Sequence, residues 1–207
     1  MKLVIATPSP YARKVRIALI EKGLPHEIVV DNPWTQGAVR EWNPLGKVPA
    51  LLLDGGRVVH DSKVIFEYLE TLGAAPALLP RDPGLRVTHK QVEATADGIC
   101  DAVVLIVAER GRPADKQSEA WIARQARKVP AALDELETLL GGKDAFTPHG
   151  YGLAEIATGC ALGYLDLRYP EHDWRAAHAG LVRLKARLDA RPSFATTVPV
   201  AQEIAAG

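Results

Sequence analysis

Apolar residues in the first third of the chain form short runs and helical repeats, a pattern that predicts a small mixed sheet with helices. Residues 3–6 form an apolar run typical of a buried strand, and residues 10–22 repeat apolar side chains on one helical face. Residues 27–30 predict a second strand, parallel to the first because a helix joins the two. The prolines and glycines within residues 31–46 then exclude a long element there.

The next segment predicts a hairpin and a second helix. Two apolar runs, residues 48–53 and 57–60, flank an Asp-Gly-Gly turn, which favours two antiparallel strands. Residues 62–72 place apolar side chains on one helical face, and Gly73 is the expected end of that helix. This part of the chain therefore predicts a mixed sheet covered by helices.

The remainder of the chain predicts helices without strands. Residues 74–83 contain three prolines and no helical period, which indicates a linker. Residues 153–169 are apolar on all faces, so we expect this helix to lie at the centre of a helical domain. Apolar spacing marks three further helices, at residues 84–110, at 181–188 before Pro192, and at 121–140 with a kink at Pro130.

The composition favours an ordinary globular protein. Of 207 residues, 47% are hydrophobic, and 25 basic residues balance 25 acidic ones, which argues against nucleic-acid and anionic-membrane partners. No apolar stretch approaches the roughly 20 residues of a membrane span, and no signal peptide is visible, so we expect a cytoplasmic protein. Cys100 and Cys160 lack metal-site spacing and are expected to be buried small hydrophobes.

The junction at Ser9 and Pro10 carries the first chemical signal. Ser9 lies at the expected N-cap of the first helix, and Pro10 lies at its first position. A hydroxyl there lies beside unpaired main-chain N–H groups at the positive end of the helix dipole, an arrangement that can hold an anion. The alternative, that Ser9 serves only as a helix cap, stays open on this stretch alone.

Four segments in order carry a resemblance that spans nearly the whole chain. They are Ser9–Val15, Asn43–Leu51, Asp61-Ser62 and Arg191–Phe194. With them the chain resembles a glutathione S-transferase, with spacing similar to bacterial, serine-type, tau- or omega-like members. The resemblance implies a thioredoxin-like, glutathione-binding domain (βαβ then ββα) at residues 1–75, a linker at 76–83 and an all-helical domain at 84–207. It also implies a homodimer.

The resemblance assigns the glutathione site residue by residue. Ser9 matches the catalytic position, whose hydroxyl hydrogen-bonds to the glutathione sulfur, and Pro49 matches a cis-proline that exposes the main chain of Val48 to the cysteinyl backbone. Lys47 corresponds to a lysine that contacts the glycine carboxylate. The γ-glutamyl end corresponds to Asp61 and Ser62, although the family usually has Glu or Gln where Asp61 stands.

The resemblance also implies a second-substrate site and glutathione as co-substrate, with no metal. The site would lie among Tyr11, Ile99, Val103, Arg110 and Phe194, of which the apolar positions could equally be core. Thr7 is a second nearby hydroxyl and is a less favoured donor because it precedes the cap.

A departure from the family lies at the start of the central helix. The family's Ser or Thr cap and its Asp are replaced by Gly152 and Glu155, and we expect Glu155 to bond back to the Gly152 N–H.

Three functions remain open at this point. The first is an enzyme that adds the glutathione thiolate to a hydrophobic electrophile. The second is a non-catalytic glutathione-binding or regulatory module on the same fold. The third is isomerase or lyase action at the same site. Redox chemistry of the glutaredoxin kind is disfavoured, because Ser9 and Ala12 stand where a Cys-x-x-Cys would lie and serine forms no mixed disulfide.

Overall fold

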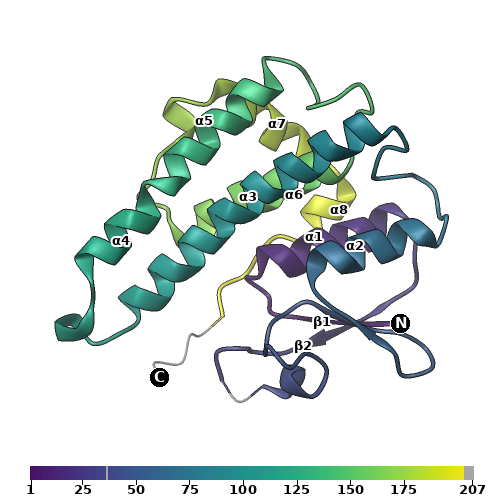
Figure 1. The fold of residues 1–207 in the computed structure, drawn as a ribbon, viewed down its shortest axis with the longest axis horizontal. Coiled ribbons are helices and arrows are strands. Elements are labelled where there is room, and N and C mark those ends of the chain that lie inside the picture. Colours follow the sequence, from purple (N-terminus) through teal and green to yellow (C-terminus); the bar gives the residue numbers. More distant parts are fainter. Residues whose placement is uncertain (36, 203–207) are drawn as a thin grey trace. The chain divides into compact units, whose positions relative to one another are not determined.

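The computed structural model describes residues 1–35 and 37–202, and the chain divides into two compact units (Figure 1). The first unit contains Met1–Leu78 together with the segment that begins at Pro192, and the second contains Leu79–Arg191. This division differs from the expected helical domain at 84–207. The C-terminal segment groups with the first unit because it forms hydrogen bonds with that unit. For example, the Arg13 side chain donates to the Phe194 carbonyl.

The first unit contains a four-stranded mixed sheet in the order β2-β1-β3-β4. The two strands joined by the first helix are parallel, with Leu3 opposite Ile28, and the predicted hairpin is antiparallel. β1 and β3 are also antiparallel, with Leu3 opposite Leu51. The strand bounds are β1 Lys2–Ile5, β2 Glu27–Val30, β3 Ala50–Leu52 and β4 Val58–Val59.

Two helices, α1 (Pro10–Glu21) and α2 (Ser62–Thr71), lie on one side of this sheet (Figure 1). α1 is followed by Gly23, whose φ of 59° is left-handed. The other face packs against the 3₁₀ helix η1 (Ala38–Glu41), because Val4, Val39 and Ala50 form one buried cluster. Apolar side chains on both faces of the sheet therefore build the core of this unit.

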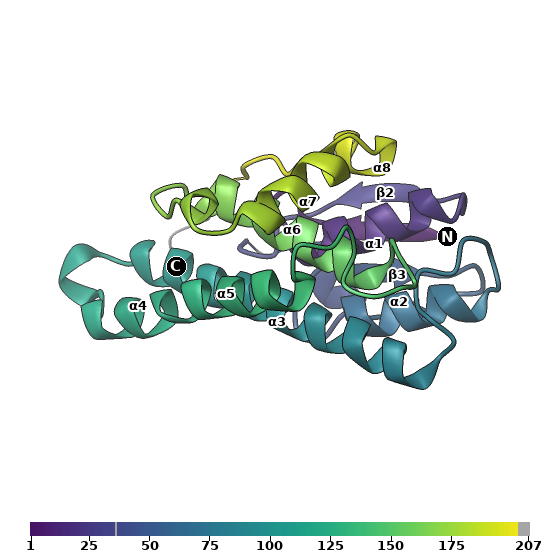
Figure 2. The same ribbon diagram turned by 90° about the horizontal axis from the view of Figure 1, so that it is seen from above.

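The second unit is helical, and all of its residues from 79 to 191 lie outside strands. Figure 2 shows α6 between α3 and α7, and α6 is buried on every face from Leu153 to Leu165. The central position expected for residues 153–169 is thus confirmed. The helices are α3 Pro83–Arg110, α4 Glu119–Ala126, α5 Lys128–Leu140, α6 Leu153–Arg168 and α7 Ala179–Asp189, with 3₁₀ helices η2 Ala114–Lys116 and η3 Trp174–Ala176.

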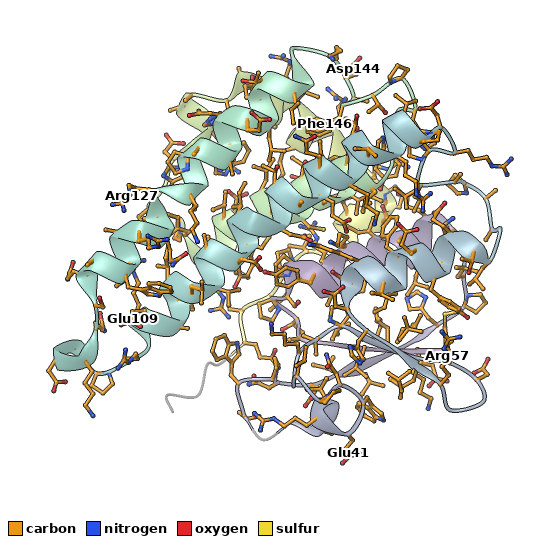
Figure 3. The ribbon with its side chains drawn as sticks, in the orientation of Figure 1. Glu41, Arg57, Glu109, Arg127, Asp144 and Phe146 are labelled. Carbon is orange, nitrogen blue, oxygen red and sulfur yellow. The ribbon has the colours of Figure 1, made fainter. Side chains whose placement is uncertain are left out.

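The helix predicted through residues 121–140 with a kink at Pro130 is divided into two helices close to that proline. The helix is interrupted at Arg127 (Figure 3), three residues before Pro130, and becomes α4 and α5. Pro130 has no N–H to donate to the carbonyl of Ala126, and its ring clashes with that carbonyl. In the first turn of a new helix the missing N–H costs nothing, so the break moves upstream of the proline.

The start of α6 is stabilised as predicted by Glu155. Its carboxylate accepts hydrogen bonds from the main-chain N–H of Gly152 (2.9 Å) and of Phe146 (2.9 Å). Burial raises the pKa of Glu155 above its usual range, although these hydrogen bonds oppose that rise.

Among the described residues, no helix combines the length and apolarity that crossing a membrane requires.

Candidate functional site

The sheet order brings three junctions of the first unit to one end of the sheet. β1 and β3 are antiparallel, with Val4 opposite Ala50, so the end of β1 lies beside the start of β3. β4 is also antiparallel to β3, with Leu51 opposite Val59, so the end of β4 lies at that same end. The β1–α1 loop, the start of β3 and the β4–α2 junction therefore converge there.

Ser9 lies at the β1–α1 junction as the N-cap of α1. Its hydroxyl oxygen accepts a hydrogen bond from the Ala12 N–H over 3.2 Å, and its carbonyl accepts from Arg13 over 3.0 Å. Within the described part of the chain these contacts leave the hydroxyl hydrogen without an acceptor. The first turn of α1 contains no acidic residue. The partly buried hydroxyl can therefore donate to an anion at the positive end of the helix dipole.

Thr7, the second hydroxyl of this loop, is already engaged. Its Oγ1 donates to the carbonyl of Val200 over 3.0 Å, and the Val200 N–H donates back to the Thr7 carbonyl over 3.3 Å. A hydroxyl has only one hydrogen to donate. The preference for Ser9 over Thr7 as the donor to a bound anion thus has a structural basis.

The segment before β3 is held by Asn43, a residue whose separate role the sequence reasoning missed. Asn43 is 1% exposed; its side-chain nitrogen donates to the Lys47 carbonyl over 2.8 Å, and its side-chain oxygen accepts from the Leu45 N–H over 3.0 Å. Gly46 completes the turn with a φ of 61°. The sequence signal for this role is the Asn itself, because Asn side chains commonly hydrogen-bond to the main chain two residues further on.

Val48 and Pro49 follow this turn at the start of β3. The Val48–Pro49 peptide bond is cis, as the resemblance implies. Neither the N–H nor the carbonyl of Val48 has a hydrogen-bond partner among the residues that the structure describes. Main-chain groups in this state can pair with an extended peptide, in the manner of one more strand. Lys47, immediately before them, is exposed.

Asp61 and Ser62 form the junction between β4 and α2. The exposed Asp61 is the N-cap of α2, and its Oδ1 accepts from the Lys63 N–H over 2.9 Å. Ser62 is buried and opens the helix, whose first turn carries no acidic residue. The helix N-terminus favours a carboxylate, while the Asp61 side chain adds a negative charge that suits an ammonium group.

The residues expected to contact a second substrate fall in both units. In the first unit Tyr11 is partly buried and Phe194 is buried. In the second unit Ile99 and Val103 are buried in α3, while the exposed Arg110 pairs with Glu171 and lies over the Tyr169 ring, 5.4 Å from its centroid. Their role toward a substrate stays a prediction.

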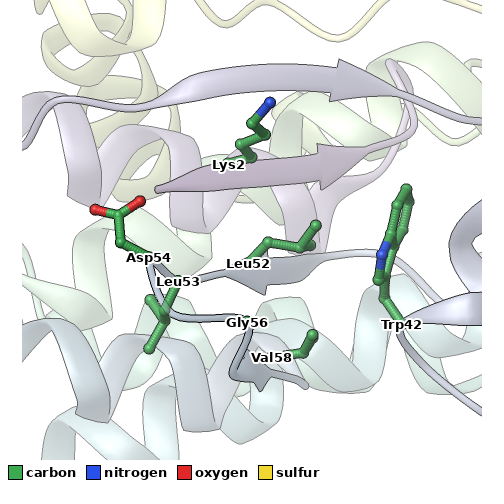
Figure 4. Close-up of a pocket in the computed structure, with 7 residues that line it drawn as sticks. All are labelled: Lys2, Trp42, Leu52, Leu53, Asp54, Gly56 and Val58. Carbon is green, nitrogen blue, oxygen red and sulfur yellow. The ribbon is translucent and has the colours of Figure 1, made fainter.

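A separate pocket of about 260 Å³ lies on the sheet face that carries Val4 and Ala50, between Trp42 and the hairpin turn (Figure 4). It is formed by the start of β1, the end of β3 and the hairpin turn. The charges at its rim are already paired: Lys2 with Glu27 over 3.1 Å, and the chain's amino group with Asp54 over 3.5 Å. The pocket is lined by Lys2, Trp42, Leu52, Leu53, Asp54, Gly56 and Val58.

A thioredoxin-like unit with a helical second unit is the architecture of the glutathione S-transferases, and comparison with known proteins agrees. The family model of the glutathione S-transferase N-terminal domain matches residues 8–72, and that of the C-terminal domain matches residues 119–184. The uncharacterized GST-like protein YibF of Escherichia coli K12 is 42% identical over 200 residues, 96% of this chain and 98% of that protein. The chain belongs to the glutathione S-transferase family.

Two solved structures resemble the chain over nearly its full length. A glutathione S-transferase of Methylobacterium radiotolerans JCM 2831, in complex with glutathione sulfonate, is 50% identical with a TM-score of 0.96, covering 99% of this chain and 97% of that one. A glutathione S-transferase of Methylobacillus flagellatus KT with bound glutathione is 38% identical with a TM-score of 0.93, covering 96% and 99%.

Proposed function

We propose that this protein is a glutathione transferase in which Ser9 stabilises the glutathione thiolate for addition to a hydrophobic electrophile. The glutathione bound in the two similar structures supports the first part of this proposal. The observation that carries the second part is the Ser9 hydroxyl, which accepts from Ala12 and keeps its own hydrogen for a ligand.

The remaining proposed contacts follow the tripeptide along the end of the sheet. The main chain of Val48 pairs with the cysteinyl main chain of glutathione, and the cis bond to Pro49 holds Val48 in that position. Lys47 contacts the glycine carboxylate. The α-carboxylate and ammonium of the γ-glutamyl end lie at Ser62 and Asp61. Each charge of bound glutathione then meets a complementary group: the N-terminus of α1 for the thiolate, Lys47 for the glycine carboxylate, the N-terminus of α2 for the α-carboxylate and Asp61 for the ammonium.

The energetics of this design are sufficient without a metal or a general base. A free thiol has a pKa of about 8.5, so only a few per cent is ionised at pH 7. A fall of two units requires about 2.7 kcal/mol of preference for the anion. A hydrogen bond to a charged group supplies about 1.5–3 kcal/mol, and the helix N-terminus adds up to about 1 kcal/mol. Placement of the electrophile beside the sulfur supplies the remaining acceleration.

The test is the pKa of the glutathione thiol in the complex, measured from thiolate ultraviolet absorbance as the pH is varied. We expect immobilised glutathione to retain the protein, and Ser9→Ala to raise the bound thiol's pKa by about one to two units. Retention with an unchanged pKa would contradict the catalytic proposal and favour a non-catalytic binding module. Failure of glutathione to raise the melting temperature would contradict binding itself.

We further propose that the protein acts as a homodimer. α3 exposes Val87 and Leu105, which are 18 residues apart and so lie on the same helical face five turns apart. Two separated apolar residues are normal on a protein surface, so the proposal rests on the resemblance to a family whose members form dimers. Light scattering should give a molar mass twice that of the 22.4 kDa chain, and the monomer mass would contradict this assembly.

A further inference from the structure

The C-terminal end of the first unit runs along α1 toward the loop that carries Ser9. We name residues 192–202, which include the short helix α8 (Pro192–Ala195), the C-terminal strap. At one end of the strap, the Ser193 hydroxyl donates to the Glu21 carboxylate at the last residue of α1. At the other end, the Gln202 side chain donates to the Asp31 carbonyl over 3.2 Å, just beyond β2.

Arg13 connects the middle of the strap to the first turn of α1. Its guanidinium donates to the Phe194 carbonyl over 3.2 Å and to the Thr197 hydroxyl over 3.4 Å, and lies over the Phe194 ring. The residue is 4% exposed, so these contacts replace most of its hydration. Its main-chain N–H donates to the Ser9 carbonyl over 3.0 Å. The residue that closes the helical turn of Ser9 is thus fixed by the strap.

Thr7 connects the strap to the loop itself. The reciprocal pair of bonds with Val200 fixes both the side chain and the carbonyl of Thr7, two residues before Ser9. Within the loop, the Ser9 N–H donates to the Ala6 carbonyl, which directly follows β1, over 3.0 Å. The loop between β1 and α1 is therefore anchored at both its ends and in its middle.

We infer that the C-terminal strap positions the Ser9 hydroxyl, with Thr7 and Arg13 as positioning residues that do not touch glutathione. This inference rests on the proposed function of Ser9. A hydrogen bond to an anion weakens steeply when its angle departs from linear, so the orientation of the cap loop sets how strongly Ser9 favours the thiolate. Loosening the loop then raises the thiol's pKa without removing a ligand contact.

The first test compares three full-length variants by the pKa of the bound glutathione thiol. Thr7→Val removes the hydroxyl at nearly constant volume, and we expect a rise of about half a unit to one unit, with KM for glutathione within about twofold. Thr7→Ser keeps the hydroxyl and should restore the original pKa. Thr196→Val removes a hydroxyl that donates to Pro192 within the strap, over 2.8 Å, and should leave the pKa unchanged.

A second variant separates positioning from direct contact of Thr7 with sulfur. Val200→Pro removes the N–H that donates to the Thr7 carbonyl, while Thr7 keeps its hydroxyl. If the strap positions Ser9, Val200→Pro also raises the thiol's pKa, and its effect does not add to that of Thr7→Val. A raised pKa in Thr7→Val together with an unchanged or lower pKa in Val200→Pro would show that Thr7 acts on the sulfur itself and would overturn the inference.

The outcome for Ser9→Ala keeps this inference distinct from the proposed function. If Ser9→Ala raises the pKa and both Thr7→Val and Val200→Pro leave it unchanged, the strap inference is wrong and the role of Ser9 stands. If Ser9→Ala leaves the pKa unchanged, the proposed function itself fails. Should Val200→Pro not fold, equal pKa values of the bound thiol in Thr7→Val and Thr7→Ser still overturn the inference.

Discussion

The Ala12 N–H donates to the Ser9 hydroxyl oxygen over 3.2 Å, so the side chain that we propose as the donor to the glutathione sulfur also caps α1. Ser9→Ala should therefore have two separable effects. Loss of the cap should lower the free energy of unfolding by about 1 kcal/mol, measured by urea denaturation. Loss of the hydroxyl hydrogen should reduce kcat/KM at neutral pH, through the rise in the thiol's pKa, by more than that loss of stability explains.

A matched control for this prediction exists in the second unit. Ser118 caps α4 in the same way, with its hydroxyl accepting from the Trp121 N–H over 3.3 Å. Ser118→Ala should cost a similar free energy of unfolding and leave both kcat/KM and the bound thiol's pKa unchanged. Equal kinetic losses in the two variants would mean that Ser9 acts through stability alone.

The charge of Asp61 can be tested without disturbing its cap. Asn is as good an N-cap as Asp, so Asp61→Asn should keep the bond from the Lys63 N–H and the stability of α2. It removes the proposed partner of the glutathione ammonium, and we expect about tenfold weaker binding, which corresponds to about 1.4 kcal/mol. Isothermal calorimetry measures this. Asp82→Asn, at the equivalent cap of α3, should bind glutathione normally.

The side chain of Lys22 anchors the chain beyond α2. Its Nζ lies 2.9 Å from Oε1 of Glu70 and donates to the carbonyls of Ala74 and Pro76, each over 2.9 Å. The Lys22 side chain is 1% exposed and the Glu70 side chain is 13% exposed. Lys22→Met should lower the free energy of unfolding by about 3 kcal/mol, because it leaves the largely buried Glu70 carboxylate without its cationic partner, with only the Leu78 N–H donating to it among the described residues.

The exposed pair of Lys2 and Glu27 provides the comparison for Lys22→Met. Those side chains are 56% and 71% exposed, and exposed pairs contribute at most about 1 kcal/mol. Lys2→Met should therefore leave the urea midpoint nearly unchanged. Similar midpoints for the two variants would show that the Lys22 contacts do not stabilise the fold.

The features predicted correctly from the sequence are those that depend on neighbours along the chain. The cap at Ser9, the left-handed Gly73 and the return bond of Glu155 each involve residues within three positions of one another. The convergence of the site also follows from local signals, because the order of strands and connections fixes which ends of the sheet meet.

The features that were missed depend on partners far apart in the sequence or on competition between local rules. Thr7 and Val200 are 193 residues apart, and no periodicity or motif in either segment signals the other. The sequence predicts a kink at Pro130 rather than a break at Arg127, because a kink and a break have the same local signal. The proposed glutathione contacts follow from the resemblance alone, since a lone Lys or an Asp-Ser pair is mostly structural.

His89 makes the stability of the second unit depend on pH. The buried ring accepts from the Ala154 N–H at Nδ1 over 3.4 Å, so its hydrogen lies on Nε2, which contacts the Thr147 hydroxyl at 2.8 Å. Burial, with a smaller contribution from His149, lowers the pKa of His89 from 6.5 to about 4. The unfolded chain then binds a proton that the folded chain does not, and stability falls as pH falls from about 6.5 to about 4.

His89→Gln should flatten this pH dependence, because Gln does not titrate. Glu155 acts in the opposite direction, since its raised pKa contributes stability that is lost as pH rises through its folded value. Wild type and variant share Glu155, so the difference between their free energies of unfolding isolates His89. Thr147→Val removes the ring's partner and should lower stability while keeping the pH slope. An unchanged slope in His89→Gln, from urea titrations between pH 4 and 7, would show that another group causes the dependence.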